Sequence, residues 1–549
     1  MNRQVGRIAL PVLAALAFQA CVTAGAYFGA TSPPGDQILY ISNQSEPRSL
    51  DPHKTAGVPE SAIMLNLYDC LTTYDPKTSE PIPCIATSWE SNADASVWTF
   101  HLRSDATWTD GRPLTADDFV YSWRRLADPA TASPYANLIY YVKNGEAIND
   151  SKLDDITQLG VRAIDAHTLE VTMERPTAFF LAMTPHYAFA AVPQWAIEAW
   201  GDQWVTPEHN VSSGPYRLVK RVPYDRIVLE KWNGHWDAAR CVITRAVYLP
   251  VEDQNTAVNL YKAKEVYVLA GGGQSVPTSF VKALRGKKDF HINAEYGTYY
   301  YSLNVRRPPL NDARVRRALA LSIDKKEICE KYLGAGQIPA YDFVPPGTPG
   351  YPYPDVPKYD PDLARKLLAE AGYPNGAGFP KIEIFFNTLE SHRQLAELIQ
   401  SMWKEQLNIP VELNNQEWQV FQATREQRRF DVARDGWIAD YLDPNTFLDL
   451  FQADTFGNHS GWLNPKYTAL MEKANSDPDP QRRLAMLAQA EAILLDDMPI
   501  IPIYYYASVG LKKPFLDGWY FNPLDQHPLK FVSINNDWRP DQDTGESVH

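Results

Sequence analysis

The chain has 549 residues, too many for one hydrophobic core, so two or three domains are expected. Hydrophobic residues make up 45% of the chain and charged residues 21%, a composition that excludes fibrous and extensively disordered proteins. The formal net charge is -14, and the sequence lacks clustered Lys and Arg, which excludes a nucleic acid as the partner.

Residues 1–30 are predicted to be a targeting segment. Arg3 and Arg7 precede an apolar run at 8–20, which is too short to span a bilayer as a stable helix. The mature protein is therefore expected to be exported. Two kinds of processing stay open, because Ala24-Gly25-Ala26 suits ordinary cleavage, whereas the stretch that ends at Cys21 resembles a lipoprotein box. The second would tether the protein to a membrane through a lipidated Cys21.

Five cysteines are few for an exported chain of this length, so disulfides are not expected to hold the fold together. Cys70 and Cys84 could pair across a loop, and the alternative is that they are buried or free thiols. None of the five lies in a CxxC or zinc-ligand spacing. We expect no metal and no other cofactor.

Helical and strand patterns alternate in the first half of the chain. A helix is predicted at 59–68, with Ile63, Leu65 and Leu67 on its apolar face. Thr115 and Asp118 resemble a capping box at the start of a second helix, at 119–126. Alternating or compact apolar runs predict strands at 37–41, 96–103, 168–173, 216–219, 227–231 and 245–249.

The second half continues the mixed pattern. Pro361 and Gly372 are typical of the first position of a helix and the position just past its end. A strand, helix and strand unit follows at 381–386, 392–407 and 410–413. The remaining predicted elements are a strand at 430–433, a helix at 478–495 and a strand at 500–506. These patterns predict an α/β fold.

The segment from Arg434 to Tyr441 reads Arg-Asp-Gly-Trp-Ile-Ala-Asp-Tyr. It places a cation, an aromatic side chain and an anion within eight residues on an apolar strand. Arg434 and Asp440 would suit the two charged ends of a zwitterion, such as a peptide, lying alongside the strand. The alternative is a solvent-exposed pair of charges, which is the commoner role of two such residues.

Several motifs between about residue 37 and residue 530 carry a family resemblance. They are SLDPHK at 49–54, GVPES at 57–61, VWTFHLR at 97–103, DFVYSW at 118–123, TASPYA at 131–136, NQEW at 415–418 and YYY at 504–506. In sequence and in order, these motifs resemble the periplasmic oligopeptide-binding proteins of bacterial ABC importers, which form family 5 of the extracellular solute-binding proteins.

The resemblance implies an α/β periplasmic-binding-protein fold, a two-lobed clamshell with an extra domain inserted in the first lobe. Its implied boundaries are 31–68, 193–295 and 507–549 for lobe one, 69–192 for the inserted domain and 296–506 for lobe two. Two strands would act as the hinge. The implied partner is a short peptide, enclosed between the lobes and bound along its main chain.

The implied function is that of the substrate-binding component of a peptide ABC transport system. Such a component acts in the periplasm as a monomer and delivers its peptide to a permease in the inner membrane. A close relative in the family takes a murein peptide instead. The alternative is therefore a murein-type peptide or another small ligand, bound for sensing or recycling without a dedicated permease.

Twelve positions of this chain match ligand-binding positions of the family. Asp440 stands where an aspartate of the family pairs with the peptide α-ammonium. A cation enclosed away from water needs such an anion. Arg434 and His392 stand where the peptide carboxylate is bound. The resemblance also implies main-chain contacts at Gly57, Val58 and Gly436 with its neighbour Trp437, and cavity-lining roles for Tyr135, His186, Trp418, Arg425 and Tyr506.

The chain departs from the family pattern at two charged positions. A family lysine aligns with Leu333, and a family glutamate aligns with Ala56. A cysteine pair of some members aligns with Gly297 and Ile438, so that disulfide cannot form here. The preferred peptide length and side chains are therefore not fixed by the resemblance.

An exported peptidase is the main competing class. The sequence contains no HExxH or GxSxG motif and no cysteine in a catalytic signature. Asp440 and Asp443 could pose as an acid and base pair, but carboxylates on a loop are usually solvated. We expect a binding protein and no enzyme.

Overall fold

The computed structural model describes residues 26–269, 275–453, 457–477 and 479–542. The predicted targeting segment up to residue 25, with Cys21, lies outside these residues. No helix of the described part combines the length and the apolar character that a membrane span requires.

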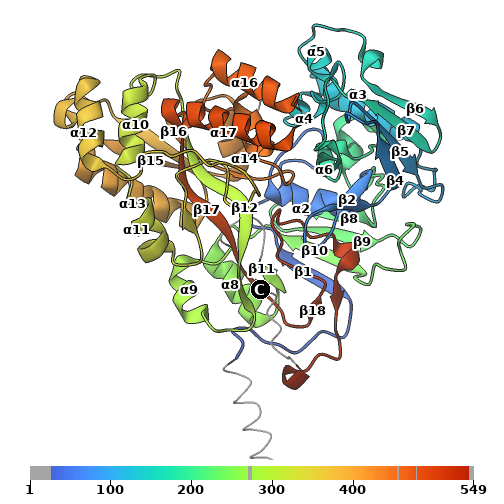
Figure 1. The fold of residues 1–549 in the computed structure, drawn as a ribbon. Helices are drawn as coiled ribbons and strands as arrows, with labels where there is room; N and C mark the ends of the chain where they lie inside the picture. Colours follow the sequence, from blue (N-terminus) through green and yellow to red (C-terminus); the bar gives the residue numbers. More distant parts are fainter. Residues whose placement is uncertain (1–25, 270–274, 454–456, 478, 543–549) are drawn as a thin grey trace, which may run out of the picture.

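One eleven-stranded sheet runs through the molecule (Figure 1). Its strand order is β15-β14-β16-β12-β17-β11-β1-β10-β9-β8, with β13 beside β17. The strands are β1 (Ile38–Ser42), β8 (Tyr216–Val222), β9 (Arg226–Lys231), β10 (Arg245–Leu249), β11 (Val268–Leu269), β12 (Phe290–Leu303), β13 (Ile338–Pro339), β14 (Ile382–Asn387), β15 (Val411–Gln416), β16 (Val432–Ile438) and β17 (Ile500–Lys512).

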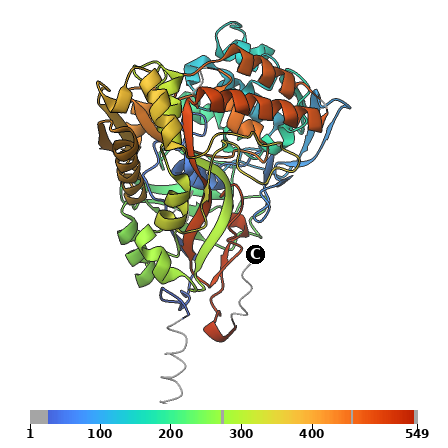
Figure 2. The same ribbon diagram turned by 60° about the vertical axis from the view of Figure 1, so that its left-hand side comes forward.

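The long strands β12 and β17 join the two halves of this sheet, and Figure 2 shows them side by side in the middle of the molecule. Their pairing is regular up to Ala294 opposite Ala507 and resumes at Thr298 opposite Tyr505. Three residues of β12 therefore oppose one residue of β17 at the junction. Such an irregularity interrupts the ladder and bends the strands where they pass from one half to the other.

Most elements predicted from the sequence are present, but several elements of the structure were not predicted, among them the long strand β12. Its C-terminal part is buried on both faces, so its side chains show no alternation between apolar and polar. β17 begins at the predicted residue and continues six residues beyond the predicted end at 506. β16 likewise extends from the predicted 430–433 region to Ile438.

The first half of the molecule carries a second sheet, of four strands in the order β4-β5-β7-β6, at the right of Figure 1. These strands are β4 (Ala86–Ser91), β5 (Val97–Leu102), β6 (Val161–Asp165) and β7 (Thr168–Thr172), and a small hairpin β2 (Thr72–Tyr74) and β3 (Pro81–Pro83) precedes them. Helix α3 (Ala116–Ala127) begins with the predicted capping box of Thr115 and Asp118. The other helices here are α2 (Val58–Leu67), α4 (Ala136–Ile139), α5 (Gly145–Asn149), α6 (Phe180–Met183), α7 (Gln194–Trp200), α8 (Gln254–Ala263) and α9 (Thr278–Leu284).

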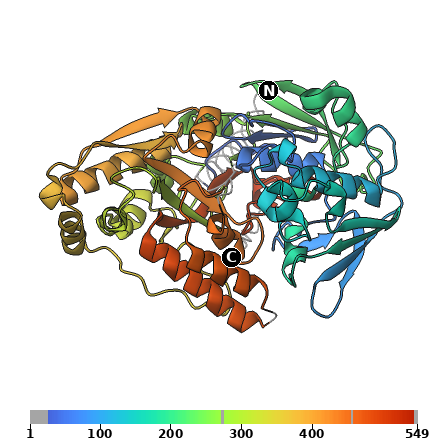
Figure 3. The ribbon, with the colours of Figure 1, turned by 90° about the horizontal axis from the view of Figure 1, so that it is seen from above.

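The second half contains the predicted strand, helix and strand unit, with β14 parallel to β15. Its helices are α10 (Ala313–Leu321), α11 (Lys325–Glu327), α12 (Pro361–Glu370), α13 (Glu390–Leu407), α14 (Trp418–Glu426), α15 (Asn445–Leu448), α16 (Pro465–Asn475) and α17 (Pro480–Asp497). The chain then returns through β17 to the first half, where β18 (Leu516–Asp517) pairs with β19 (Ser533–Ile534). Seen from above, the two halves lie side by side as two lobes (Figure 3).

Each lobe has its own hydrophobic core. The first packs around residues such as Leu39, Trp123 and Trp204, and the second around Ile384 and Trp403. Four cysteines, at 70, 84, 241 and 329, are buried free thiols. Cys70 and Cys84 therefore form no disulfide in this structure.

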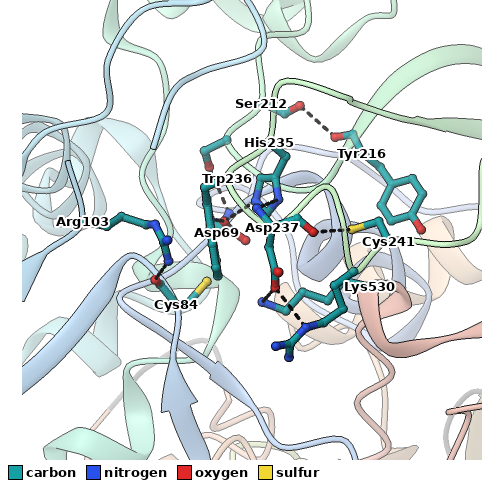
Figure 4. Close-up of polar contacts among 12 residues, drawn as sticks. Asp69, Cys84, Arg103, Ser212, Tyr216, His235, Trp236, Asp237, Cys241 and Lys530 are labelled. Atoms are coloured by element: carbon teal, nitrogen blue, oxygen red, sulfur yellow. Dashed lines mark hydrogen bonds and ion pairs between the residues drawn. The ribbon is translucent and has the colours of Figure 1, made fainter. Parts of the chain in front are cut away.

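A buried polar cluster in the first lobe joins segments that are far apart in the sequence (Figure 4). The carboxylate of Asp69 accepts hydrogen bonds from His235 Nε2 at 2.8 Å and Trp236 Nε1 at 2.9 Å. His235 Nδ1 accepts the N–H of Asp237, so its ring proton lies on Nε2 and points to Asp69. Burial acts to raise the pKa of Asp69, but His235, and after it Lys530 and Trp236, outweigh burial and hold that pKa below its usual range.

Substitution of His235 is expected to destabilise the first lobe. His235→Ala removes one donor from a buried carboxylate and should lower the free energy of unfolding by about 3 kcal/mol. The expected loss of stability lies at the low end for removing one partner of a buried carboxylate, because Trp236 still donates to Asp69. Urea unfolding measures the change, with His101→Ala, whose side chain is 48% exposed, as the control. Equal stability of the two variants would contradict a stabilising role for the cluster.

Candidate functional site

A cavity with about 1390 Å³ of empty space, part of it at the mouth, lies between the two lobes. All twelve residues singled out from the sequence line it. They are Gly57, Val58, Tyr135, His186, His392, Trp418, Arg425, Arg434, Gly436, Trp437, Asp440 and Tyr506. Sequence reasoning missed other lining residues, among them Ser61, Tyr74, Asn387, Tyr504, Asp525 and Gln526. Ser61 and Tyr504 belong to the GVPES and YYY motifs, but nothing in the sequence singled out these two residues or the other four as ligand-binding.

Asp440 lies two residues past the end of β16 and is buried, with 9% of its side chain exposed. Its Oδ1 lies 3.3 Å from His186 Nε2. His186 Nδ1 accepts the N–H of Ala188 at 3.2 Å, which leaves Nε2 as the ring nitrogen that faces Asp440. In the described residues no Lys or Arg pairs with Asp440, so His186 is its only basic neighbour and the carboxylate can receive a cation from the cavity.

Aromatic side chains surround this acidic end. The ring of Tyr135 packs on His186 at 4.6 Å between centroids and lies 6.4 Å from the ring of Trp437. Tyr74 donates from its hydroxyl to the carbonyl of Asp440 at 3.5 Å. These rings exclude water from the carboxylate and strengthen any charge interaction there.

Arg434 forms the basic end of the cavity. Its guanidinium donates to the Tyr506 hydroxyl at 3.0 Å and approaches Asn387 Oδ1 at 3.5 Å. It also lies over the ring of Tyr299, 5.0 Å from the centroid. None of the ion pairs found in the described part of the chain involves Arg434, so its positive charge is uncompensated.

His392 lies near Arg434, and its Nδ1 is 3.3 Å from the Tyr299 hydroxyl. Burial, and then the charge of Arg434, hold the pKa of His392 well below its ordinary value. The imidazole is therefore neutral in this structure. It can offer a hydrogen bond to a ligand but no charge, which leaves the electrostatic part of anion binding to Arg434.

Gly436 is required by the protein itself. A Cβ at this position would lie 2.2 Å from the hydroxyl of Tyr506. The resemblance implies main-chain contacts to a ligand at Gly436, and the structure gives the glycine a second role inside the protein. The absent side chain makes room for Tyr506, which in turn holds Arg434.

Arg425 has a carboxylate partner inside the protein. Its Nη1 lies 2.7 Å from Oδ1 of Asp435, whose Oδ2 accepts from His459 and Ser302. Although burial favours the neutral acid, Arg425 and His459 keep the pKa of Asp435 well below its usual range. Arg425 thus lines the cavity, but its charge is already compensated.

β16 has an open edge beside the cavity. It pairs with β12 along its whole length, from Val432 to Ile438. On its other side the pairing with β14 ends at Ala433. The stretch from Arg434 onward lines the cavity and can accept an additional extended strand.

Gly57, Val58 and Trp418 lie where the two lobes touch. Gly57 has a φ of 137°, and a Cβ there would lie 3.2 Å from the Trp418 ring and closer still to Glu60, so only glycine fits. Gln422, also in the second lobe, donates to the carbonyl of Ala56 at 2.9 Å. This side of the cavity is therefore closed by direct contacts between the lobes.

Comparison with known proteins agrees with this geometry. Residues 80–459 match the sequence profile described as bacterial extracellular solute-binding proteins, family 5 Middle. The periplasmic oligopeptide-binding protein OppA of Escherichia coli (strain K12) is 40% identical over 500 residues, covering 89% of this chain and 91% of that protein. The periplasmic murein peptide-binding protein MppA of the same strain is 37% identical over 495 residues, covering 88% and 91%.

Solved structures show the same relationship. Haemophilus influenzae OppA in complex with RPPGFSPFR has a TM-score of 0.88 at 36% identity and covers 92% of this chain and 100% of that one. The murein tripeptide-binding protein MppA of Escherichia coli has a TM-score of 0.87 at 36% identity, and the match covers 92% of this chain and 99% of that one. An unliganded open form of MppA has a TM-score of only 0.63 at the same identity, although the match covers 92% of this chain and 98% of that one.

The lobes of this chain are therefore arranged as in the first two structures and differ from the open form. The similarity to two-domain binding proteins confirms the α/β clamshell expected from the sequence. The chain belongs to family 5 of the bacterial extracellular solute-binding proteins.

Proposed function

We propose that this chain is the substrate-binding component of a peptide ABC transport system. It binds short oligopeptides between its two lobes and delivers them to a permease in the inner membrane. The relatives named above are periplasmic peptide-binding proteins, which supports this function and a periplasmic location. We further propose that it acts as a monomer and as a binding protein without catalytic activity.

The observation that carries the proposal is the charge layout of the cavity. In the described residues Asp440 has no Lys or Arg partner and Arg434 has no carboxylate partner, and between them runs a strand with an open edge. A free peptide supplies what each feature lacks: an ammonium, a carboxylate and a main chain able to pair. Side chains of the ligand are not needed for this binding mode, which supports broad sequence tolerance.

The spacing of the two charges limits the peptide length. Arg434 and Asp440 are six positions apart in the sequence, so their Cα atoms can lie at most about 20 Å apart. A peptide that reaches both charges can therefore have up to about six residues. Leu333, which aligns with a family lysine, is buried, so it offers no second cation for a longer ligand.

A murein-type peptide bound for sensing or recycling is the second candidate. It is favoured by the similarity to MppA, both in sequence and in structure. Native mass spectrometry of protein purified from its source distinguishes the two, since a mixture of unrelated short peptides supports transport and a single murein fragment supports the alternative. The mass of the mature protein also reports its N-terminus. We propose that the chain is either cleaved as an ordinary exported protein or tethered to the membrane through a lipidated Cys21, and a lipid on Cys21 adds to the mass.

Asp440→Asn is expected to weaken the binding of a free tripeptide. The buried ammonium loses its counter-charge, at a cost of about 2 to 5 kcal/mol, which is at least about 30-fold in Kd. Isothermal titration calorimetry measures the loss. Asp496→Asn, at a side chain that is 75% exposed, is the matched control and should bind as the wild type does. Equal affinity of the wild type for free and N-acetylated peptides would refute the proposed role of Asp440.

Arg434 is expected to recognise the peptide carboxylate. Arg434→Gln should weaken a free tripeptide by about 2 to 5 kcal/mol but change the binding of its C-terminal amide far less. The four affinities form a double-mutant cycle whose coupling energy isolates this contact. Arg393→Gln, on the exposed face of α13, is the control. A coupling energy near zero would assign the carboxylate to another group.

A further inference from the structure

Asp449 is a buried carboxyl at the contact between the two lobes, outside the peptide cavity. It begins a 3-10 turn of the second lobe, Asp449–Phe451, and is 7% exposed. Its Oδ2 accepts a hydrogen bond at 3.3 Å from the hydroxyl of Tyr141, which lies between α4 and α5 of the first lobe. The Tyr141 oxygen accepts in turn from Asn445 Nδ2 at 2.5 Å. This short chain of hydrogen bonds crosses from one lobe to the other.

Aromatic packing seals the surroundings of Asp449. Phe179 of the first lobe stacks on Tyr441 of the second, with centroids 5.8 Å apart and ring planes 12° from parallel. The same ring meets Tyr141 edge to face at 5.3 Å. The guanidinium of Arg483 covers Phe179 at 4.5 Å. The carboxyl is therefore shielded from water only while the lobes are together.

The two arginines described near Asp449 bind other groups. Arg483 of α17 is held by Asp443, with both nitrogens 2.8 Å from its oxygens. Arg175 of the first lobe lies at the same seam and donates to the backbone carbonyl of Glu472 on α16 at 3.5 Å.

The other charged groups near Asp449 are acids. Glu146 and Glu472 line the same small cavity at this seam as Asp449 and Arg175, with about 640 Å³ of empty space. Asp440 and Asp443 add negative charge from the preceding loop. Within the described ranges no Lys, Arg or His forms an ion pair with Asp449. Burial, and next the charge of Asp440, raise the pKa of Asp449 to about 8.

We propose that closing of the lobes requires Asp449 to hold a proton, so that closure and ligand affinity are coupled to the uptake of one proton. The inference uses the proposed function only as a way to drive closure with a peptide. It does not depend on which peptide is bound.

The sign of the effect follows from the two states. When the lobes separate, Asp449 gains access to water and its pKa returns toward the ordinary value of about 3.9. The closed state thus has the higher pKa, and in the empty protein its advantage is complete below about pH 4 and is lost as the pH rises through about 8. A peptide ammonium that pairs with Asp440 removes the contribution of that charge, so in the liganded closed state the advantage is lost at a lower pH. Between these limits, the Kd of any ligand that requires closure should increase by up to about tenfold per pH unit.

Calorimetry with a free tripeptide tests the coupling. Titrations at pH 6.5 in two buffers of different ionisation enthalpy report the protons taken up on binding. We expect up to about one proton more for the wild type than for Asp449→Asn, an isosteric change that keeps the acceptor oxygen. The variant should also lose most of the pH dependence of Kd and bind more tightly than the wild type at pH 7.5. Equal proton uptake in the two proteins would overturn the proposal.

Two matched variants separate this effect from other sources of protons. Tyr141→Phe removes the donor to Asp449 but keeps the carboxyl, so it should retain the proton uptake that Asp449→Asn loses. Asp496→Asn, with a largely exposed carboxyl, should behave as the wild type does. Loss of the coupling in Asp496→Asn, or its full retention in Asp449→Asn, would assign the proton to another group.

A ligand-free measurement keeps this inference separate from the proposed function. Spin labels at Ile164→Cys and Tyr359→Cys, which are exposed positions on the two lobes, report the distance between the lobes. The closed fraction should rise as the pH falls from 8 to 5, and this change should be absent in Asp449→Asn. If no peptide binds either protein, the proposed function fails and the distance measurement alone decides the coupling. Identical pH dependence of the two distance distributions would then overturn it.

Discussion

The need to compensate buried charge gives three nearby aspartates three different roles. Asp435 receives Arg425 and His459 and becomes a fixed internal support of β16. Asp440 receives only the imidazole of His186 and no Lys or Arg, so its carboxylate can pair with a cation in the cavity. Asp449 receives only neutral donors at the seam between the lobes, where burial favours the protonated acid. The residue type is the same, and the partners supplied by the fold decide the chemistry.

The strand β16 joins support and recognition in one element. The side chain of Asp435 anchors it to α14 through Arg425, while the neighbouring Arg434 faces the cavity. This alternation follows from the period of two in a strand, which sends successive side chains to opposite faces. Gly436 then admits the Tyr506 hydroxyl that holds the Arg434 guanidinium. The position of the cationic end of the cavity is therefore set by packing that no ligand needs to supply.

Much of the fold could be predicted because periodicity and caps are local properties. The capping box of α3 and the β14, α13 and β15 unit were predicted from short segments. β12 could not be, since burial on both faces removes the alternation that marks a strand. At the site, the spacing of Arg434 and Asp440 indicated a zwitterion, but the other ten positions came from family resemblance. Tyr74 and Asp449 gain their roles only from contacts between the lobes, which no local pattern contains.

The same electrostatics explains why the empty protein should resist closing. Asp440 would be taken out of water with no Lys or Arg partner and Arg434 with no carboxylate partner, and each such transfer costs several kcal/mol. The ion pair of Arg48 and Glu426 between the lobes does little to offset this cost. Its side chains are 42% and 25% exposed, and partly exposed pairs contribute little to stability. A zwitterionic ligand reverses the balance by pairing both charges at once. Coupling between ligand binding and closure can therefore arise from unpaired charge in the cavity, without strain stored in the strands β12 and β17 that join the lobes.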